Sequence, residues 1–143
     1  MKIGELAQVA QCTVETVRYY EKEGLLPAPA RTAANYRSYG HAHVEQLRFI
    51  RNCRALDMTQ GEIRMLLGLM GQPAADCGGV SRLLDEHLAH VDVRIAELSR
   101  LRQQLGQLRQ RCRHEQPMEA CGILQGLASM ETVPRHARNT HLG

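Results

Sequence analysis

The sequence predicts a mainly α-helical protein with a compact N-terminal domain followed by one long helix. Two observations indicate this. In the first half of the chain, short segments with apolar residues at helical spacing alternate with turn residues such as Gly24 and Pro27. From Val80 to Arg113, by contrast, there is no proline, the only glycine is Gly106, and apolar residues recur at helical spacing. A helix of that length spans about 50 Å.

The composition fits one small domain plus an extended helix. The chain has 143 residues, of which 43% are hydrophobic, enough for one modest core. A formal charge of +3 is compatible with nucleic-acid binding but too mild to establish it. No apolar run approaches the roughly 18 residues of a membrane span, and the first residues do not resemble a signal peptide. We therefore expect a cytoplasmic protein without a membrane partner, whose five cysteines are reduced and available as ligands.

The N-terminal segments predict two short helices joined by a tight turn, over residues 3–9 and 14–23. Thr13 is a good N-cap for the second helix, and Gly24 is suited to end it. This arrangement is typical of a helix-turn-helix, although any small helical hairpin would show the same pattern. The second helix carries a polar stripe at spacings of three and four residues, formed by Glu15, Arg18, Tyr19 and Lys22.

The following segment predicts a small hairpin and two more helices. Residues 31–35 are turn-like, and residues 35–40 alternate as a short strand would. A basic, aromatic hairpin beside a recognition helix is typical of a winged helix, in which Arg37 can contact phosphates. A helix is expected over residues 43–56, and the next begins with a capping box from Thr59 to Glu62.

Several of these motifs resemble the MerR family of transcription regulators. The resemblance rests on Ile3-Gly4-Glu5-Leu6-Ala7, on Thr16-Val17-Arg18-Tyr19-Tyr20-Glu21 with Gly24-Leu25-Leu26, on the wing segment Asn35-Tyr36-Arg37-Ser38-Tyr39, and on Phe49-Ile50-Arg51 and Leu56-Asp57-Met58-Thr59 through Ile63. It implies a winged helix-turn-helix DNA-binding domain, a long antiparallel coiled-coil dimerisation helix, and a short C-terminal metal-binding loop and helix. It also implies that the homodimer binds a pseudo-palindromic operator in double-stranded promoter DNA. There, the loaded dimer distorts the DNA so that RNA polymerase can initiate.

The resemblance gives expected domain bounds and an expected DNA surface. The DNA-binding domain covers residues 1–72, the linker and dimerisation helix residues 73–111, the metal-binding loop and short helix residues 112–130, and a disordered tail residues 131–143. The expected DNA-binding residues are Thr13, Thr16, Arg18, Tyr19, Tyr20, Lys22, Asn35, Tyr36, Arg37 and Tyr39.

The long helix independently predicts a dimer. Its apolar residues follow steps of three and four, which is the pattern of a coiled-coil seam with one three-residue stammer. Cys112 occupies the next seam position, so it is expected to face the partner, although a cysteine there could simply pack. The seam consists of Leu84, Leu88, Val91, Ile95, Leu98, Leu101, Leu105, Leu108 and Cys112.

Three cysteines lie around this helix: Cys77 before it, Cys112 at its end, and Cys121 after a short loop. Because an intact helix separates Cys77 from Cys112 in one chain, these thiols can act together only across two chains. In an antiparallel pair, the partner's Cys77 arrives beside Cys112 and Cys121. Three thiolates would then meet at each end of the dimer.

Thiolates are soft ligands that select soft or borderline metal ions. The placement of the cysteines resembles the cadmium- and lead-responsive branch of the family, which implies control of metal-resistance or efflux genes. A three-sulfur site suits Cd(II) first and Pb(II) next. Zn(II) remains a weaker inducer, since His114 could add a ligand, and Hg(II) is a further alternative.

Several other histidines and cysteines, together with Glu62, are weaker candidates for metal ligands. His87 and His90 could share a helix face and, with Glu62, form a secondary metal site, but solvated histidines and a capping Glu62 are favoured. Cys12 and Cys53 are expected to pack rather than ligate. His136 and His141 in the tail carry little weight as ligands.

The cysteines also bear on two other classes of function. A thiol redox sensor is the main alternative, because paired cysteines near a helix end could oxidise. An enzyme is not expected, since no cysteine has a base and an orienting group at useful spacing.

Overall fold

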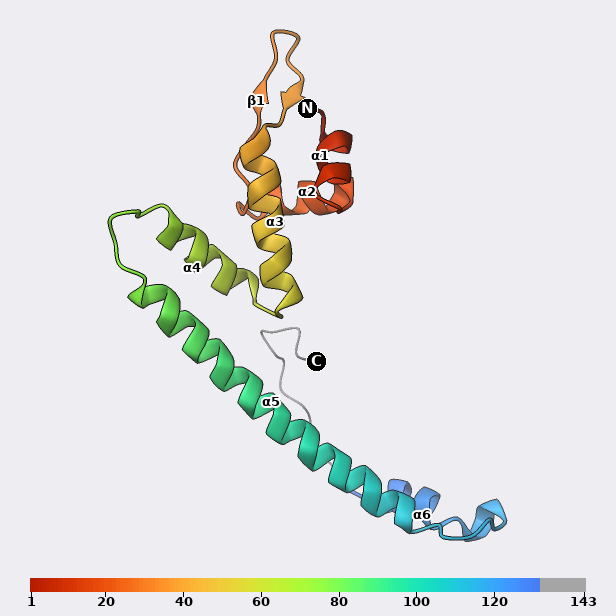
Figure 1. Cartoon of the computed structure of the whole chain (residues 1–143). Coiled ribbons are helices and arrows are strands. Elements are labelled where there is room, and N and C mark those ends of the chain that lie inside the picture. The colour runs from red at the N-terminus through yellow and green to blue at the C-terminus, as the bar shows by residue number, and fades with distance from the viewer. Residues whose placement is uncertain (132–143) are drawn as a thin grey trace. The chain divides into compact units, whose positions relative to one another are not determined.

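The computed structural model describes residues 1–131 and is mainly helical, as the sequence predicts. It divides into two units, Met1–Leu83 and a second unit that begins at Leu84 within the long helix. The elements in chain order are α1 (Ile3–Val9), α2 (Val14–Lys22), β1 (Ala30–Arg31), β2 (Arg37–Ser38), α3 (His41–Ala55), α4 (Gln60–Met70), α5 (Gly78–Gln110), the 3-10 turn η1 (Met118–Ala120) and α6 (Gly122–Ser129) (Figure 1).

Helices α1 and α2 form the expected helix-turn-helix. Thr13 is the N-cap of α2, and its hydroxyl accepts a hydrogen bond from the Thr16 N–H at 3.1 Å. Helix α2 ends one residue earlier than predicted, with Glu23 as its C-cap. Gly24 follows with φ of 73°, a left-handed conformation that favours glycine. Val17 on the inner face of α2 is fully buried.

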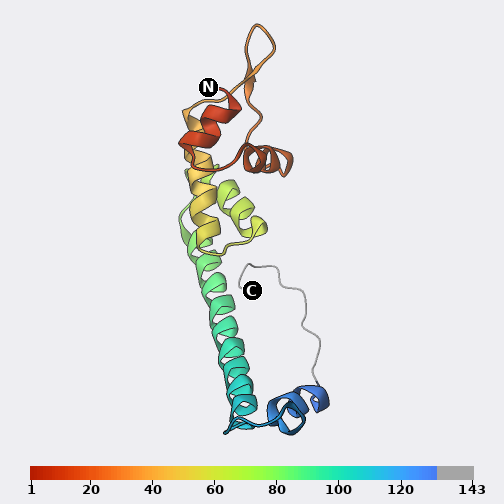
Figure 2. The ribbon, with the colours of Figure 1, turned by 90° about the vertical axis from the view of Figure 1, so that its right-hand side faces the viewer.

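The wing is a two-stranded antiparallel hairpin, and it projects from the helices of its unit (Figures 1 and 2). The register pairs Ala30 with Ser38 and Arg31 with Arg37. The turn contains Asn35 at φ of 65°, a conformation that asparagine tolerates better than most residues. Arg31 is a strand residue, which corrects the expectation that it belongs to the turn.

Helices α3 and α4 complete the first unit, Met1–Leu83, which is called the head below. Helix α3 begins at His41, two residues earlier than predicted, because Gly40 is its N-cap and the Gly40 N–H donates to His43 Nδ1 at 3.1 Å. The capping box of α4 is confirmed, with Thr59 and Glu62 satisfying each other's backbone N–H groups. Two apolar clusters hold the head together. Their buried members are Leu6, Ala7, Ala10, Val17, Leu26, Tyr39, Val44 and Leu47 in the first, and Leu25, Ile50, Cys53, Met58, Ile63, Leu66 and Leu83 in the second.

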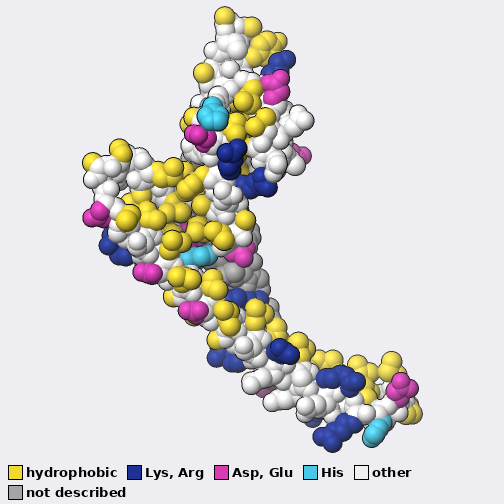
Figure 3. Space-filling model, in the orientation of Figure 1, with side chains coloured by type: hydrophobic (Ala, Val, Ile, Leu, Met, Phe, Trp, Pro, Cys, Tyr) yellow, Lys and Arg dark blue, Asp and Glu magenta, His cyan; other side chains and the backbone are white. Residues whose placement is uncertain are grey.

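Helix α5 is one unbroken helix of 33 residues. Apolar side chains recur along its surface among basic ones (Figure 3). Many of its seam residues are exposed in the single chain: Leu88 by 60%, Ile95 by 56% and Leu105 by 58%. Within residues 1–131, no helix combines the length and the apolar character needed to cross a membrane. His136 and His141 lie outside the described residues.

Candidate functional site

An open pocket of about 730 Å³ lies between α2 and the wing and is rich in positive charge. Its polar lining contains Arg18, Lys22, Arg31 and Arg37 against the single carboxylate of Glu21. Such a surface attracts polyanions, and arginine forms paired hydrogen bonds with phosphate oxygens. The pocket therefore has the chemistry of a phosphate-backbone contact, and the remaining lining residues are Ile3, Ala28 and Pro29.

Glu21 orients Arg37 in this pocket. Arg37 Nη1 lies 3.2 Å from Glu21 Oε2, and the Tyr39 hydroxyl donates to Glu21 Oε1 at 2.5 Å. The Glu21 side chain is only 14% exposed, whereas that of Arg37 is 48% exposed. The inner carboxylate thus fixes one side of the guanidinium while the other side remains available to a ligand.

The structure corrects the expected DNA surface at Tyr39. Its side chain is 2% exposed and packs in the first apolar cluster, so its ring cannot contact DNA. Burial raises the pKa of Tyr39, and the hydrogen bond to Glu21 raises it further. Tyr39 therefore supports Glu21 and, through it, Arg37. Tyr20 is similar in part, since it is half-buried against both clusters.

The remaining expected DNA residues lie mostly at the surface. Tyr36 is 70% exposed on the hairpin, and Tyr19 is 46% exposed, with its hydroxyl bonded to Gln60. The hydroxyls of Thr13 and Thr16 are 2.8 Å apart at the start of α2. Sequence reasoning missed Arg31 as a site residue. Pairing of the two strands could have identified it, because directly opposite residues such as Arg31 and Arg37 share one face of the hairpin.

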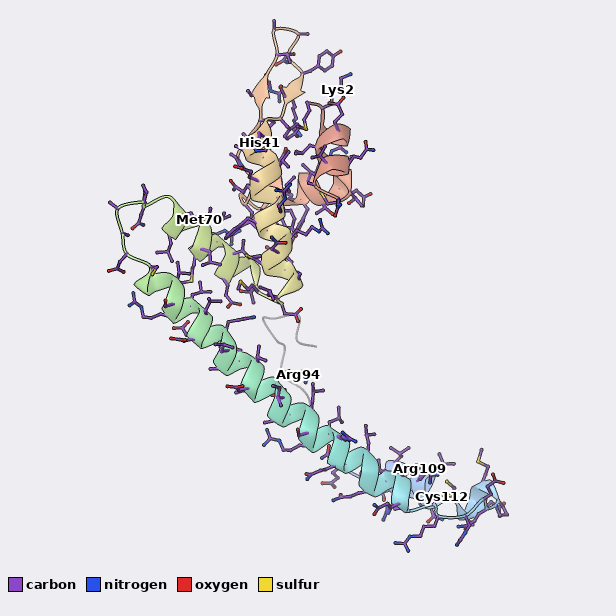
Figure 4. All side chains as sticks on the ribbon, in the orientation of Figure 1. Lys2, His41, Met70, Arg94, Arg109 and Cys112 are labelled. Atoms are coloured by element: carbon purple, nitrogen blue, oxygen red, sulfur yellow. The ribbon has the colours of Figure 1, made fainter. Side chains whose placement is uncertain are left out.

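A second candidate site lies at the end of α5, where the structure brings Cys112 and Cys121 together. Helix α5 ends at Gln110, and Cys112 follows it by two residues (labelled in Figure 4). The Cys112 backbone carbonyl accepts a hydrogen bond from Arg109 Nη1 at 2.7 Å, and Cys112 Sγ lies 3.2 Å from the His114 carbonyl oxygen. Cys121 is the N-cap of α6 and directly precedes Gly122, which lies against Arg111, the residue before Cys112.

The start of α6 favours the thiolate form of Cys121. The backbone N–H of Leu124 lowers the pKa of Cys121, and the N–H of Ile123 and the Cys112 side chain lower it further, against partial desolvation. Backbone N–H groups at a helix start commonly stabilise a thiolate in this way. A thiolate beside a second thiol is a pair of soft donors, which fits a thiophilic metal ion.

The third predicted ligand, Cys77, is exposed and lies just before α5. Within residues 1–131 of one chain, no group of three or more His, Cys, Asp or Glu residues lies close enough to hold a metal ion. The described part of one chain therefore supplies no complete three-ligand site. This arrangement is compatible with a site between subunits.

The secondary site of Glu62, His87 and His90 stays a prediction. The Glu62 carboxylate is used in the capping box of α4. His87 is buried with 6% exposure, while His90 on the same helix is exposed. His114 is exposed in the loop, where its backbone carbonyl faces the Cys112 thiol.

We expect the five cysteines to differ strongly in alkylation rate at neutral pH. A lowered pKa gives Cys121 a larger thiolate fraction than an ordinary thiol, whereas burial raises the pKa of Cys12 and Cys53. Cys121 should react well before Cys53, and its rate should level off at a lower pH. Iodoacetamide labelling followed by peptide mass spectrometry measures both. Equal rates for Cys121 and the buried Cys53 would contradict this order.

Comparisons with known proteins match most of the chain to regulators of one family. A family described as MerR HTH family regulatory protein matches residues 1–69, and one described as MerR, DNA binding, matches residues 44–108. An HTH-type transcriptional regulator ZntR homolog from Haemophilus influenzae is 46% identical over 121 residues, covering 83% of this chain and 90% of that protein.

Two solved structures are also similar. The transcription regulator PbrR691 from Ralstonia metallidurans, solved in complex with lead(II), is 49% identical with a TM-score of 0.82, covering 89% of this chain and 98% of that one. The regulator MerR from Bacillus megaterium, solved with mercury(II), is 29% identical with a TM-score of 0.72, covering 90% of this chain and all of that one (100%).

Proposed function

Because the chain belongs to the MerR family of helix-turn-helix transcription regulators, we propose that it is a metal-responsive activator of metal-resistance or efflux genes. Its relatives are DNA-binding regulators and not enzymes. The effector is Cd(II) or Pb(II), held by Cys112 and Cys121 of one chain with Cys77 of its partner. The observation that carries this proposal is that the backbone segments bearing Cys112 and Cys121 lie against each other at the end of α5, through Arg111 and Gly122.

The head binds double-stranded promoter DNA through the basic pocket between α2 and the wing. Arg18 and Lys22 come from the helix that a helix-turn-helix places in the major groove. Arg31 and Arg37 come from the hairpin, where they reach the phosphate backbone. Phosphate contacts fix the register of the protein on the duplex, and contacts from α2 to base edges provide sequence discrimination.

We expect Arg37→Ala to weaken binding to every DNA sequence and to reduce the salt dependence. Each lost phosphate contact lowers the slope of log affinity against log salt by about one unit. Arg18→Ala should in addition cost roughly 1–3 kcal/mol of discrimination if its guanidinium reaches a base edge. Fluorescence anisotropy on the promoter at several salt concentrations measures both effects, with Arg100→Ala on α5 as the control. Unchanged affinity and slope in the Arg37 and Arg18 variants would remove the pocket from the DNA interface.

The dimer is held by α5, whose seam we propose to be an antiparallel coiled coil. Exposed leucines and isoleucines at steps of three and four need a partner surface, and an identical helix offers one with the same spacing. In the antiparallel orientation, the start of one α5 lies beside the end of the other. The partner's Cys77 is then delivered to the pair formed by Cys112 and Cys121.

The ligand set fits soft, large ions. A bound thiophilic ion would link Cys112 and Cys121 of one chain to the partner's Cys77, and this linkage would be the signal to the DNA-binding domain. The similarity to PbrR691, which was solved with lead(II), supports Pb(II) as an effector. Two alternatives follow from the other similarities. The ZntR homolog supports Zn(II), with His114 as an added ligand, and the structure of MerR with mercury(II) supports Hg(II).

The experiment that tests the proposal is a transcription titration with the chain's own promoter and RNA polymerase. Cd(II), Pb(II), Zn(II) and Hg(II) are added separately to the reduced dimer. Activation by Cd(II) or Pb(II) at the lowest free concentrations is the expected result. Activation that instead follows disulfide formation without metal would identify a thiol redox sensor, the alternative that the contact between Cys112 and Cys121 favours.

A further inference from the structure

Helix α6 is seated on the end of α5 through a glycine that has no room for a side chain. A Cβ atom built at Gly122 would lie 2.5 Å from the Arg111 carbonyl oxygen and 3.1 Å from Arg111 Cβ. Both distances are shorter than ordinary van der Waals contact. Gly126, one helical turn later, faces the same residue, and a Cβ there would collide with the Arg111 guanidinium and lie 2.9 Å from Leu108 Cδ2. Figures 1 and 2 show α6 beside this end of α5.

The atoms next to the two glycines differ in how easily they can move. Gly122 faces backbone, and this backbone is held in place: the Arg111 N–H donates to the Leu108 carbonyl at 3.1 Å, and Arg109 Nη1 donates to the Cys112 carbonyl at 2.7 Å. Gly126 faces only the ends of flexible side chains. A methyl group at residue 122 must therefore displace α6, whereas one at residue 126 can displace the side chains of Arg111 and Leu108.

The thiol of Cys121 moves with α6. Cys121 directly precedes Gly122, and its carbonyl accepts the Gln125 N–H at 3.1 Å while its own N–H donates to the Met118 carbonyl at 3.2 Å. On the other side of the pair, Cys112 directly follows Arg111, the residue against which Gly122 is seated. The contact between Gly122 and Arg111 thus joins the two backbone segments that carry Cys121 and Cys112.

We propose that Gly122 is a positioning residue, whose missing side chain lets α6 sit against the Arg111 backbone and thereby sets the separation of the Cys112 and Cys121 thiols. The inference deepens the proposed metal-sensing function and rests on it for its biological meaning. Its physical content concerns the metal-free chain. Gly122 acts through Cys121 and touches no metal itself.

The test measures how readily the two thiols of the metal-free dimer react with each other. In a glutathione buffer, one glutathione disulfide oxidises the two thiols to the Cys112–Cys121 disulfide and is reduced to two glutathione thiols. The equilibrium constant is the effective concentration of one thiol at the other, which falls steeply when reacting groups are misplaced. Peptide mapping of the quenched mixture gives the fraction of disulfide.

We expect Gly122→Ala to lower this effective concentration on the order of tenfold to a hundredfold. Gly126→Ala should lower the effective concentration by less. Adding Arg111→Ala to Gly126→Ala should reverse part of that loss, because the Arg111 guanidinium is the group with which the new methyl collides. Adding Arg111→Ala to Gly122→Ala should not restore the effective concentration, because the methyl group at residue 122 collides with the Arg111 backbone. Gly106→Ala is the matched control, since a Cβ at Gly106 meets nothing within 4 Å.

Promoter affinity of the metal-free variants checks that the DNA-binding head is folded. An effective concentration in Gly122→Ala equal to that of the wild type would overturn the positioning role and leave metal sensing untouched. Restoration of Gly122→Ala by Arg111→Ala would overturn the assignment of the contact to the Arg111 backbone. Failure of the wild-type dimer to bind Cd(II) would remove the proposed function alone, because the thiol equilibrium contains no metal.

Discussion

Replacing any one of Cys77, Cys112 and Cys121 by serine is expected to abolish activation by Cd(II) and Pb(II) while promoter binding persists. A serine hydroxyl is a hard, neutral donor and does not replace a thiolate toward soft ions. Every homodimer of such a variant lacks one thiolate in both sites. The loss of metal affinity should exceed the roughly 10–100-fold that follows removal of a residue that only supports a ligand.

Transcription with increasing metal, together with the sulfur-to-metal charge-transfer absorbance, measures this loss. The matched control is Cys12→Ser, which changes a partly buried thiol of the DNA-binding head whose pKa is raised by desolvation. Full induction of the Cys112→Ser or Cys121→Ser dimer by Cd(II) would show that the pair at the end of α5 is not the sensor.

Metal is expected to raise transcription strongly while changing promoter affinity by less than about tenfold. The proposed activation mechanism requires that metal-free and metal-bound dimers both occupy the operator and that the shape of the DNA differs. Bending or twisting a site of this size costs on the order of a few kcal/mol. A coupling free energy between two sites is typically about 1–3 kcal/mol, and a tight metal–thiolate linkage can supply it.

Energy transfer between dyes at the two ends of the promoter measures the distortion, and a parallel titration measures affinity. A metal-dependent change in end-to-end distance at nearly constant affinity is the expected result. Release from DNA by a hundredfold or more on metal addition would make the protein a derepressor. The activation mechanism would then be wrong, although metal sensing would survive.

Much of the fold could be predicted because the helix ends carry local signals. Thr13 and Thr59 cap α2 and α4 as expected, and Gly24 adopts the positive φ that its place after α2 indicates. The apolar spacing located α5, but it overestimated the C-terminal end. The helix ends at Gln110. Beyond it, the backbone N–H groups donate to carbonyls three residues earlier, and the Arg109 side chain donates to the Cys112 carbonyl. Side-chain capping of this kind leaves no trace in hydrophobic periodicity.

The site residues that sequence reasoning misjudged depend on tertiary contacts. Tyr39 belongs to the wing motif, yet its ring is buried because it packs within the first apolar cluster. Arg31 joins the basic pocket through strand pairing with Arg37, which the turn-like composition of its neighbours concealed. The approach of the segments that carry Cys112 and Cys121 depends on the path of the loop between them and on the packing of Gly122 against Arg111. No periodic pattern encodes either feature.

The central claim is that each metal site is built from two chains, and a mixed dimer tests it most directly. One chain carries Cys77→Ser and keeps Cys112 and Cys121, while the other carries Cys112→Ser and keeps Cys77. If the sites form in trans, one site of this dimer is complete, and the other lacks both substituted thiols. We expect tight Cd(II) binding at about one ion per mixed dimer, with little in either parent homodimer. A well-folded mixed dimer without a tight site would contradict the trans arrangement and place all the ligands within one chain.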